Sequence, residues 1–307
     1  MSRELERSTA PLRNGLPYKA SAWQGRLRSP VIEGLMRART LNVAGHYLVL
    51  CMLAVICVFP FWWTLVTALS TEGNIFAFPP TFWPQSPSLE NFAEVFRAIP
   101  MLSFFKNSLL IAALTVFWKL ALCSAAAYPL SRMHFRGRKL VFGIILATLV
   151  LPSEVNFLVN FITVTKLSLV DTYTGVILPN VVTAVAILLL KQAFDEVPQD
   201  LVDAARVDGA GEWTIFTKIM LPLITPWLAT VGILTAVEAW NEYIWPSIVM
   251  SKPDEFPLSV GVLYLRGTFG SSTRVIAAGT VLTILPTLAA FLFTQRFFMR
   301  GMDGAVK

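Results

Sequence analysis

Acidic side chains gather in two stretches of the sequence, and these are the first places to look for chemistry. One runs from Asp195 to Asp208, and the other contains Glu238 and Glu242 beside amide and aromatic residues. A membrane-embedded transferase, for prenyl or acyl groups, would need clustered catalytic carboxylates or a histidine near a membrane face. The two histidines are far apart, and the three cysteines lie in apolar windows without a CxxC pair. The pattern therefore favours contact and binding roles over catalysis or a metal site.

The composition predicts that the elements carrying these residues cross a bilayer. Of the 307 residues, 55% are hydrophobic and 14% charged, and the mean hydropathy is +0.62, whereas a soluble domain carries about 25% charged residues. A membrane span needs about 20 apolar residues. Six windows meet this need, approximately 43–69, 105–130, 140–165, 174–194, 219–250 and 275–298. We therefore expect an all-α integral membrane protein with six transmembrane helices.

The positions of the basic residues predict the orientation. With the N-terminus inside, most of the 25 Lys and Arg residues fall in inner segments, as the positive-inside rule requires. The N- and C-termini are then cytoplasmic, and the net charge of +6 needs no nucleic-acid partner. We expect residues 1–40 to be a mostly disordered cytoplasmic arm, whose last part, "VIEGLMRART", could instead form a basic interfacial helix. Residues 41–307 would form the membrane domain.

The segment "DLVDAARVDGAGEWTIFTKIMLPLITP" (200–226) interrupts two of the most apolar windows and should be cytoplasmic. Leu201, Ala204, Ala205 and Asp208 follow at helical spacing and predict one narrow face that can lie close to another protein. Gly209 should end this helix in the left-handed conformation. A second helix should begin at about residue 212. The alternative is an ordinary interfacial helix without a partner.

This segment resembles the cytoplasmic signature of ATP-binding-cassette (ABC) importer permeases, E-A-A-x-x-x-G-x₉-I-x-L-P. The matching residues are Asp203, Ala204, Ala205, Gly209, Ile219, Leu221 and Pro222, with Asp in place of the usual Glu. The stretches "FKNSLLIA" (105–112), "AWNEYIWPSIVM" (239–250), "FPLSVGV" (256–262) and the end of the chain from residue 277 are similar to the smaller permease subunit of maltose-type carbohydrate importers. The resemblance covers residues 43–307 and implies the type I importer permease fold.

The resemblance also implies a mechanism. Residues 196–212 would be a coupling-helix loop seated in an ATPase subunit, with Asp203, Ala204, Ala205, Asp208, Gly209, Leu221 and Pro222 as its coupling residues. The sequence has no G-x-x-x-x-G-K-[ST] phosphate loop. The chain would therefore be a transport subunit and no enzyme, without a cofactor of its own, while ATP and Mg²⁺ bind to a partner ATPase dimer.

The other implied partners are a second permease subunit, an extracytoplasmic solute-binding protein and membrane lipid. The location would be the bacterial cytoplasmic (inner) membrane. Outer segments 70–104 and 251–274 are the expected docking surfaces for the binding protein.

Polar side chains inside spans are costly and tend to face a partner or an aqueous cavity. The candidates for the solute pathway are Glu238, Trp240, Asn241, Glu242 and Tyr243 in the fifth window, where hydrogen bonds and aromatic stacking could hold a sugar. Secondary candidates are Glu154, Asn156, Asn160 and Asn180. The same groups could instead only join helices by hydrogen bonds.

Two other transport functions stay open at this point. An importer permease for a non-sugar solute, such as a glycerophosphate or an osmolyte, would have the same spans and the same signature. A secondary transporter would work alone and would not need a coupling segment. Inverted repeats are typical of that class, and the sequence has no clear internal repeat.

Overall fold

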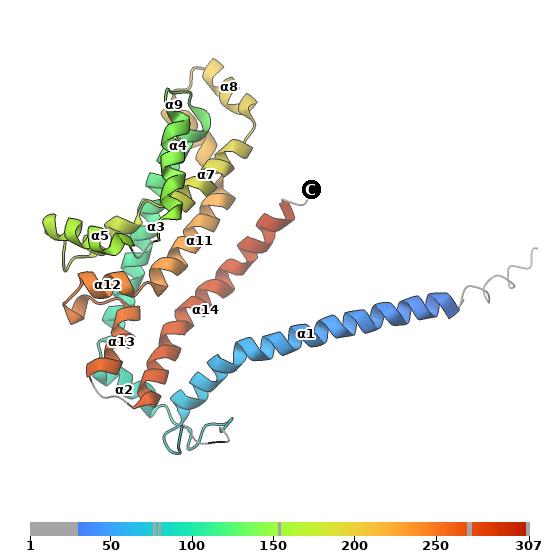
Figure 1. Cartoon of the computed structure of the whole chain (residues 1–307), viewed down its shortest axis with the longest axis vertical. Coiled ribbons are helices and arrows are strands. Elements are labelled where there is room, and N and C mark those ends of the chain that lie inside the picture. The colour runs from blue at the N-terminus through green and yellow to red at the C-terminus, as the bar shows by residue number, and fades with distance from the viewer. Residues whose placement is uncertain (1–29, 76–77, 79–80, 153–154, 269–271, 305–307) are drawn as a thin grey trace, which may run out of the picture. The chain divides into compact units, whose positions relative to one another are not determined.

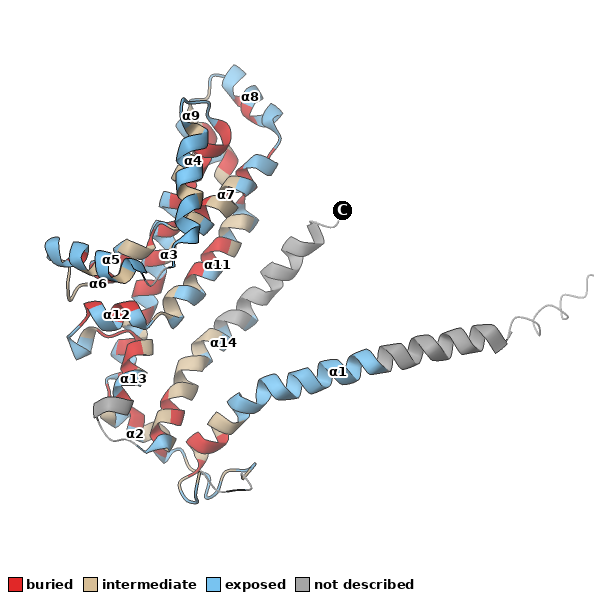
Figure 2. Cartoon of the chain, in the orientation of Figure 1, coloured by how far each residue is buried: buried red, intermediate tan, exposed pale blue. Residues whose placement is uncertain are grey.

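The computed structural model describes residues 30–75, 78, 81–152, 155–268 and 272–304. The chain forms two compact units, residues 1–61 and residues 62–307. Helix α1 (Pro30–Leu69) includes the last part of the predicted arm, residues 30–40, and residues 1–29 lie outside the described part. From Gly45 to Phe61 this helix is exposed and apolar (Figure 2). Apolar side chains on all sides are typical of a helix whose solvent is lipid.

In the described residues of the second unit, the regular elements are helices, joined by loops, and Ser70 and Pro87 form an isolated β-bridge (Figure 1). Its longer helices are α3 (Met101–Arg132), α7 (Ala184–Glu196), α11 (Thr225–Asn241) and α14 (Thr273–Gly304). Shorter helices precede α3 and lie between the long ones: α2 (Glu90–Ala98), α4 (Arg138–Ala147), α5 (Val155–Lys166), α6 (Tyr173–Ile177), α8 (Gln199–Val207), α9 (Glu212–Thr214), α10 (Leu221–Leu223), α12 (Ile244–Val249) and α13 (Leu258–Thr268). Helix α3 packs on both α7 and α11, and this trio is the centre of the unit.

The apolar windows hold helices, but three of them are bent. Among the described residues, Gly45–Leu69 and Met101–Arg132 are long and apolar enough to cross a membrane unbroken. Three bent pairs of helices raise the number of candidate spans to five, with angles of 110° near residue 152, 52° near residue 182 and 77° near residue 224. In α14 the described apolar stretch is the shorter Thr273–Ala289. The count of six spans therefore stays a prediction.

Proline explains the sharp bend before α11. Pro226 has no backbone N–H, so the carbonyl of Pro222 loses its usual helical partner. The Thr225 hydroxyl donates to that carbonyl at 2.7 Å instead. Polar backbone groups freed inside a membrane need such substitutes.

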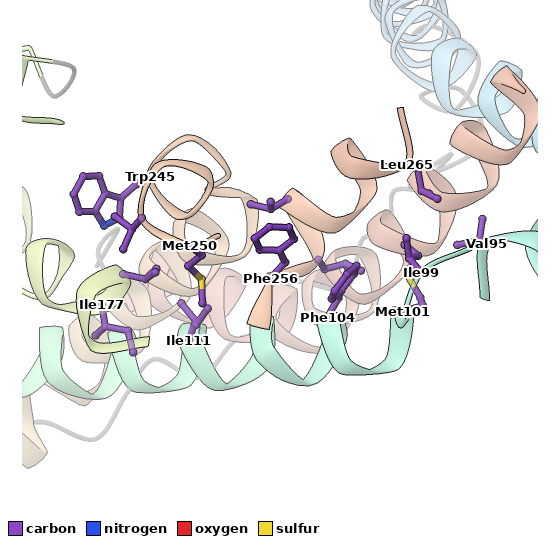
Figure 3. Close-up of a cluster of buried hydrophobic side chains, with 14 of the residues drawn as sticks. Val95, Ile99, Met101, Phe104, Ile111, Ile177, Trp245, Met250, Phe256 and Leu265 are labelled. Atoms are coloured by element: carbon purple, nitrogen blue, oxygen red, sulfur yellow. The ribbon is translucent and has the colours of Figure 1, made fainter. Parts of the chain in front are cut away.

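The buried side chains form two clusters along α3. The outer cluster joins α3 to α2, α6, α12, α13 and α14, with Phe104, Ile111, Trp245 and Phe256 among its members (Figure 3). The inner cluster joins α3 to α7, α8 and the segment that leads into α11, through Cys123, Tyr128, Phe194, Phe216 and other residues. The middle of α3, between Ile111 and Cys123, belongs to neither cluster's buried apolar set.

Helix α2 follows Ser88 and is amphipathic. Val95 and Ile99 are buried and Phe92 packs partly against the outer cluster, whereas Leu89 and Phe96 are exposed. Ser88 accepts a hydrogen bond from the Glu90 backbone N–H at 3.1 Å. Helix α2 packs on α14.

Asn107 fastens the loop between α12 and α13 to α3. Its amide nitrogen donates to the carbonyls of Asp254 (2.9 Å) and Phe256 (3.1 Å), and its amide oxygen accepts from the Tyr173 hydroxyl at 2.9 Å. The neighbouring Ser108 hydroxyl accepts from the Leu258 backbone N–H at 2.7 Å. The segments "FKNSLLIA" and "FPLSVGV" therefore meet in space.

We predict that Asn107→Ala lowers the free energy of unfolding by about 2–3 kcal/mol, since three hydrogen bonds are lost at about 1 kcal/mol each. The thermal unfolding midpoint and the rate of proteolysis in residues 251–257 measure this effect in purified protein. Lys106→Ala, at the adjacent exposed position, is the matched control. Equal behaviour of the two variants would show that Asn107 does not hold the loop.

Candidate functional site: a glycine-ended helix and an ion pair between spans

Helix α8 ends in the glycine turn that the sequence predicts. Gly209 has φ +82°, a conformation that glycine adopts without a Cβ clash. The Ala210 N–H donates to the Ala205 carbonyl at 2.9 Å and the Gly209 N–H donates to the Arg206 carbonyl at 3.0 Å. These two bonds form a Schellman motif, which satisfies the last carbonyls of a helix. The next helix, α9, begins at Glu212 as expected.

The prediction of one face of α8 that lies close to another protein is wrong for one of its four residues, Ala205. Ala205 is buried together with Val202 in the inner cluster, so it faces this chain's own core. Leu201, Ala204 and Asp208 are exposed, as are Asp203 and Val207. The helical spacing placed Ala205 beside Ala204 correctly, but only the packing decides which edge of the face turns inward.

Charged and polar side chains brace the turn on the side of Asp203. Asp203 accepts hydrogen bonds from Gln199 (3.0 Å) and Arg206 (3.2 Å). Arg206 also pairs with Glu212 at 2.9 Å across the turn, and this hydrogen bond is the main cause that raises the pKa of Arg206. The second oxygen of Glu212 accepts from the Tyr128 hydroxyl of α3 at 2.7 Å. The series of contacts Asp203–Arg206–Glu212–Tyr128, which we call the brace, therefore links α8 to both α9 and α3.

Arg132, at the C-terminal end of α3, holds the turn between α7 and α8. It is buried and donates to Gln199 Oε1 at 2.7 Å, and to the carbonyls of Phe194 and Val197. In the sequence, Arg132 is only one of the Lys and Arg residues that predict the orientation of the chain. Its position at the end of an apolar window was the available signal, but its partners lie more than 60 residues away.

The second half of the signature lies at the backbone break before α11. Ile219 is in the π-helical segment η4 (Ile215–Met220), and Leu221 and Pro222 form the short helix α10. Ile219 and Leu221 pack partly against the inner cluster, and Pro222 is exposed. π-helical turns frequently mark functional sites. The signature residues therefore contain one change of direction, at Gly209, and end just before a second one at residue 224.

An ion pair joins α3 and α11 in the region between the two apolar clusters. Lys119 Nζ lies 3.4 Å from Glu238 Oε2, and the side chains are 5% and 72% exposed, respectively. Lys119 is in the middle of α3, on the buried stripe with Thr115 and Cys123. An exposed carboxylate within a span is costly against lipid, so the face with Glu238 is expected to meet water or a protein partner.

The other candidates of the fifth window have different surroundings. Trp240 packs edge-on against Phe105, at 5.7 Å between ring centroids, and its buried indole N–H has no partner among the described residues. Asn241 is exposed and donates to the Val237 carbonyl of its own helix at 2.8 Å. Tyr243 is exposed at the start of α12.

Glu242 is occupied locally. Its carboxylate accepts the backbone N–H groups of Ile244 (2.9 Å) and Trp245 (3.1 Å) at the start of α12. This contact satisfies two unpaired donors of the helix end. A capping role therefore accounts for Glu242 without a solute.

The secondary candidates are not gathered at one place. Asn156 is exposed and Asn160 half-buried on α5, which packs against α12, whereas Glu238 lies on α11 against α3. Asn180 donates to the Val176 carbonyl at 3.1 Å. Glu154 lies outside the described residues.

Comparisons with known proteins agree with this arrangement. Residues 120–302 match the family described as "Binding-protein-dependent transport system inner membrane component". The chain is 38% identical over 228 residues to the arabinooligosaccharides transport system permease protein AraQ of Halalkalibacterium halodurans, covering 74% of this chain and 82% of that protein. It is 30% identical to the sn-glycerol-3-phosphate transport system permease protein UgpE of Yersinia pestis, covering 88% and 98%.

A solved structure of a bacterial ABC transporter involved in the import of the acidic polysaccharide alginate has a similar fold. The TM-score is 0.75 at 22% sequence identity, covering 85% of this chain and 98% of that chain. At this identity the likeness concerns the fold alone. Because the family match spans more than half of the chain and the permease relatives cover most of it, the chain belongs to the inner membrane components of binding-protein-dependent transport systems.

Proposed function

We propose that this chain is the permease subunit of an ATP-driven importer for a neutral sugar or oligosaccharide in the bacterial inner membrane. It would form half of the solute pathway and convert the motion of a partner ATPase into movement of its spans. The observation that carries the proposal is the α8 turn, which ends at Gly209 and is braced to α3 and α9. The permease relatives support the solute class, because the first of them is named for arabinooligosaccharides.

The outward face of α8 is the proposed seat for the ATPase. Leu201, Ala204, Val207 and Asp208 are exposed there, and the small side chain of Ala204 allows a close approach. Ala205 would act from behind by packing into the inner cluster. Asp203 would act through the brace, because its carboxylate is shared by Gln199 and Arg206.

The brace would transmit a movement of α8, caused by the ATPase, to the membrane spans. A displacement of α8 would act through Arg206 and Glu212 on the segment that leads into α11, and through Glu212 on Tyr128 of α3. Arg132 would carry the same displacement to the end of α7. These contacts support the motion of α3, α7 and α11 as one packed group, with the bend at residue 224 as the place where α11 changes angle.

The Glu238 face of α11 is the proposed wall of the solute pathway. Glu238 is the sole charged residue of α11, and its carboxylate is open while the ammonium of Lys119 is buried behind it. Carboxylate oxygens accept hydrogen bonds from hydroxyl groups and repel anions. This charge arrangement favours a neutral polyhydroxy solute over a glycerophosphate. Asn241 and Tyr243, both exposed, could add hydrogen bonds.

The assembly is tested by affinity purification of the tagged chain from native membranes in mild detergent. We expect recovery of an ATPase, a second permease and an extracytoplasmic binding protein, which can then be titrated with neutral oligosaccharides and with glycerol 3-phosphate. Binding of the phosphate ester alone would move the proposal to an anionic solute. A chain that purifies alone and moves solute without ATP would contradict it.

A further inference from the structure

A cavity of 1020 Å³ lies where α3 ends and α4 begins. It is lined by residues of the connecting loop, by the first turns of α4 and by Lys191 of α7. The coupling loop and the ion pair contribute none of its lining. The cavity is therefore a separate feature of the described chain that transport of solute does not explain.

The charges around the cavity are positive and mostly uncompensated. Arg136 and Lys139 are exposed and have no hydrogen-bond or ionic partner among the described residues. Arg138 donates only to backbone carbonyls, those of Ser131 (3.0 Å) and Met133 (3.3 Å), which leave its charge in place. Lys191 is the exception, because Asp195 lies 2.5 Å from it. Three positive charges thus line this cavity without a counter-ion among the described residues.

The start of α4 adds to this positive potential. This ten-residue helix begins at Arg138, has no acidic residue in its first turn and has no side-chain cap at Gly137. The N-terminal end of a helix carries a partial positive charge and unpaired N–H groups, and basic residues there are unfavourable. An anion bound at this end would satisfy the N–H groups and neutralise the neighbouring cations.

The same cavity has an apolar wall. Phe135, Leu140 and Phe142 line it, and no residue of α4 is buried (Figure 2). Leu140 and Ile144 are 68% and 58% exposed on this apolar helix. A small soluble anion would leave that wall uncovered, whereas an amphipathic anion would cover both the cations and the apolar surface.

We propose that this cavity binds the phosphate headgroup of an anionic phospholipid at the membrane surface, with its acyl chains along the exposed side of α4. Basic pockets beside membrane helices on the cytoplasmic side bind such headgroups. Residues 1–40 of this chain are not a suitable occupant, because they carry eight basic residues and three acidic ones. The site adds a lipid-recognition element to the α3–α4 connection, next to the end of α3 that holds the α8 turn.

Titration of the full-length chain in detergent, followed by native mass spectrometry, tests the site. The probes are phosphatidylglycerol, phosphatidylcholine with the same acyl chains, and inorganic phosphate. We expect phosphatidylglycerol to bind at least about tenfold more tightly than phosphatidylcholine, since two or more cations contact its headgroup. Inorganic phosphate in excess should displace little of it.

The variant Arg136→Gln/Lys139→Gln should reduce the affinity for phosphatidylglycerol at least about fivefold. Lys166→Gln/Lys218→Gln removes the same charge at exposed positions outside the cavity and should leave the affinity unchanged. Equal binding of the two lipids, or equal losses in both double variants, would overturn the proposal. Complete displacement by inorganic phosphate would assign the cavity to a soluble anion. If the lipid is lost when the ATPase binds, the cavity would be assigned to a protein contact instead of a lipid.

Discussion

Gly209→Asp is expected to leave the chain in the membrane at close to the wild-type amount and to lower solute uptake at least about 100-fold. Gly209 has φ +82°, and a Cβ at this position would meet no described atom within 4 Å beyond its two neighbours in the chain. The cost inside the chain is then the backbone strain alone, about 1–2 kcal/mol for most residues and less for Asp or Asn. The larger effect should come from outside, because the new carboxylate projects beside Asp208 on the proposed ATPase face.

Two further variants at residue 209 separate the effect of strain in the turn from the effect on the contact with the ATPase. Gly209→Asn keeps the tolerance for the left-handed conformation without the charge, and Gly209→Ala adds strain with little bulk. Uptake by native-membrane vesicles and the amount of co-purified ATPase should fall in the order Ala, Asn, Asp if contact and charge dominate. Full uptake by Gly209→Asp with the ATPase still bound would show that α8 is not the coupling element.

The second large effect is expected from the ion pair between α3 and α11. Glu238→Gln removes the counter-ion of Lys119, whose side chain is 5% exposed. Leaving a buried charge unpaired costs about 3–5 kcal/mol, and the lower value applies here because the Glu238 side chain is 72% exposed. We therefore expect Glu238→Gln to lower the free energy of unfolding by about 3 kcal/mol, measured by thermal unfolding in detergent.

Removing the lysine should have a much smaller effect. Lys119→Met leaves Glu238 exposed and solvated, so the expected loss is below about 1 kcal/mol. The double variant Lys119→Met/Glu238→Gln should recover most of the stability lost in Glu238→Gln, because no charge stays buried. A stable Glu238→Gln protein together with an unstable Lys119→Met protein would contradict the pairing. If Lys119→Met still takes up a neutral sugar and gains no uptake of an anionic one, this result would support the proposal that the Glu238 face of α11 lines the solute pathway.

Local signals in the sequence were enough to predict the backbone features between α8 and α11. The left-handed glycine at residue 209, the start of the next helix at residue 212 and the proline kink near residue 224 follow from the properties of one or a few adjacent residues. Backbone sterics and missing N–H groups act within a turn of helix, so they are readable without a fold. The apolar windows are also read from adjacent residues, although bends in three of them leave two unbroken candidate spans among the described residues.

Contacts between distant residues were decided by the tertiary structure. Helical spacing identified Ala204 and Ala205 as neighbours, but burial in the inner cluster turned Ala205 inward. In the sequence, Lys119 is only a charge within a span, whereas the packing of α11 on α3 places Glu238 3.4 Å from it. Glu242 is a pathway candidate in the sequence, whereas in the structure it caps the start of α12. Arg132 likewise gained its role from the carbonyls at the end of α7.

The sequence by itself therefore determined that the chain is helical and membrane-embedded, and where the glycine turn after α8 lies, because hydrophobicity and glycine or proline geometry are properties of single segments. Only the packing of α3, α7 and α11 decided which polar side chains meet across the spans, since the partners of a buried charge are set by which helices become neighbours.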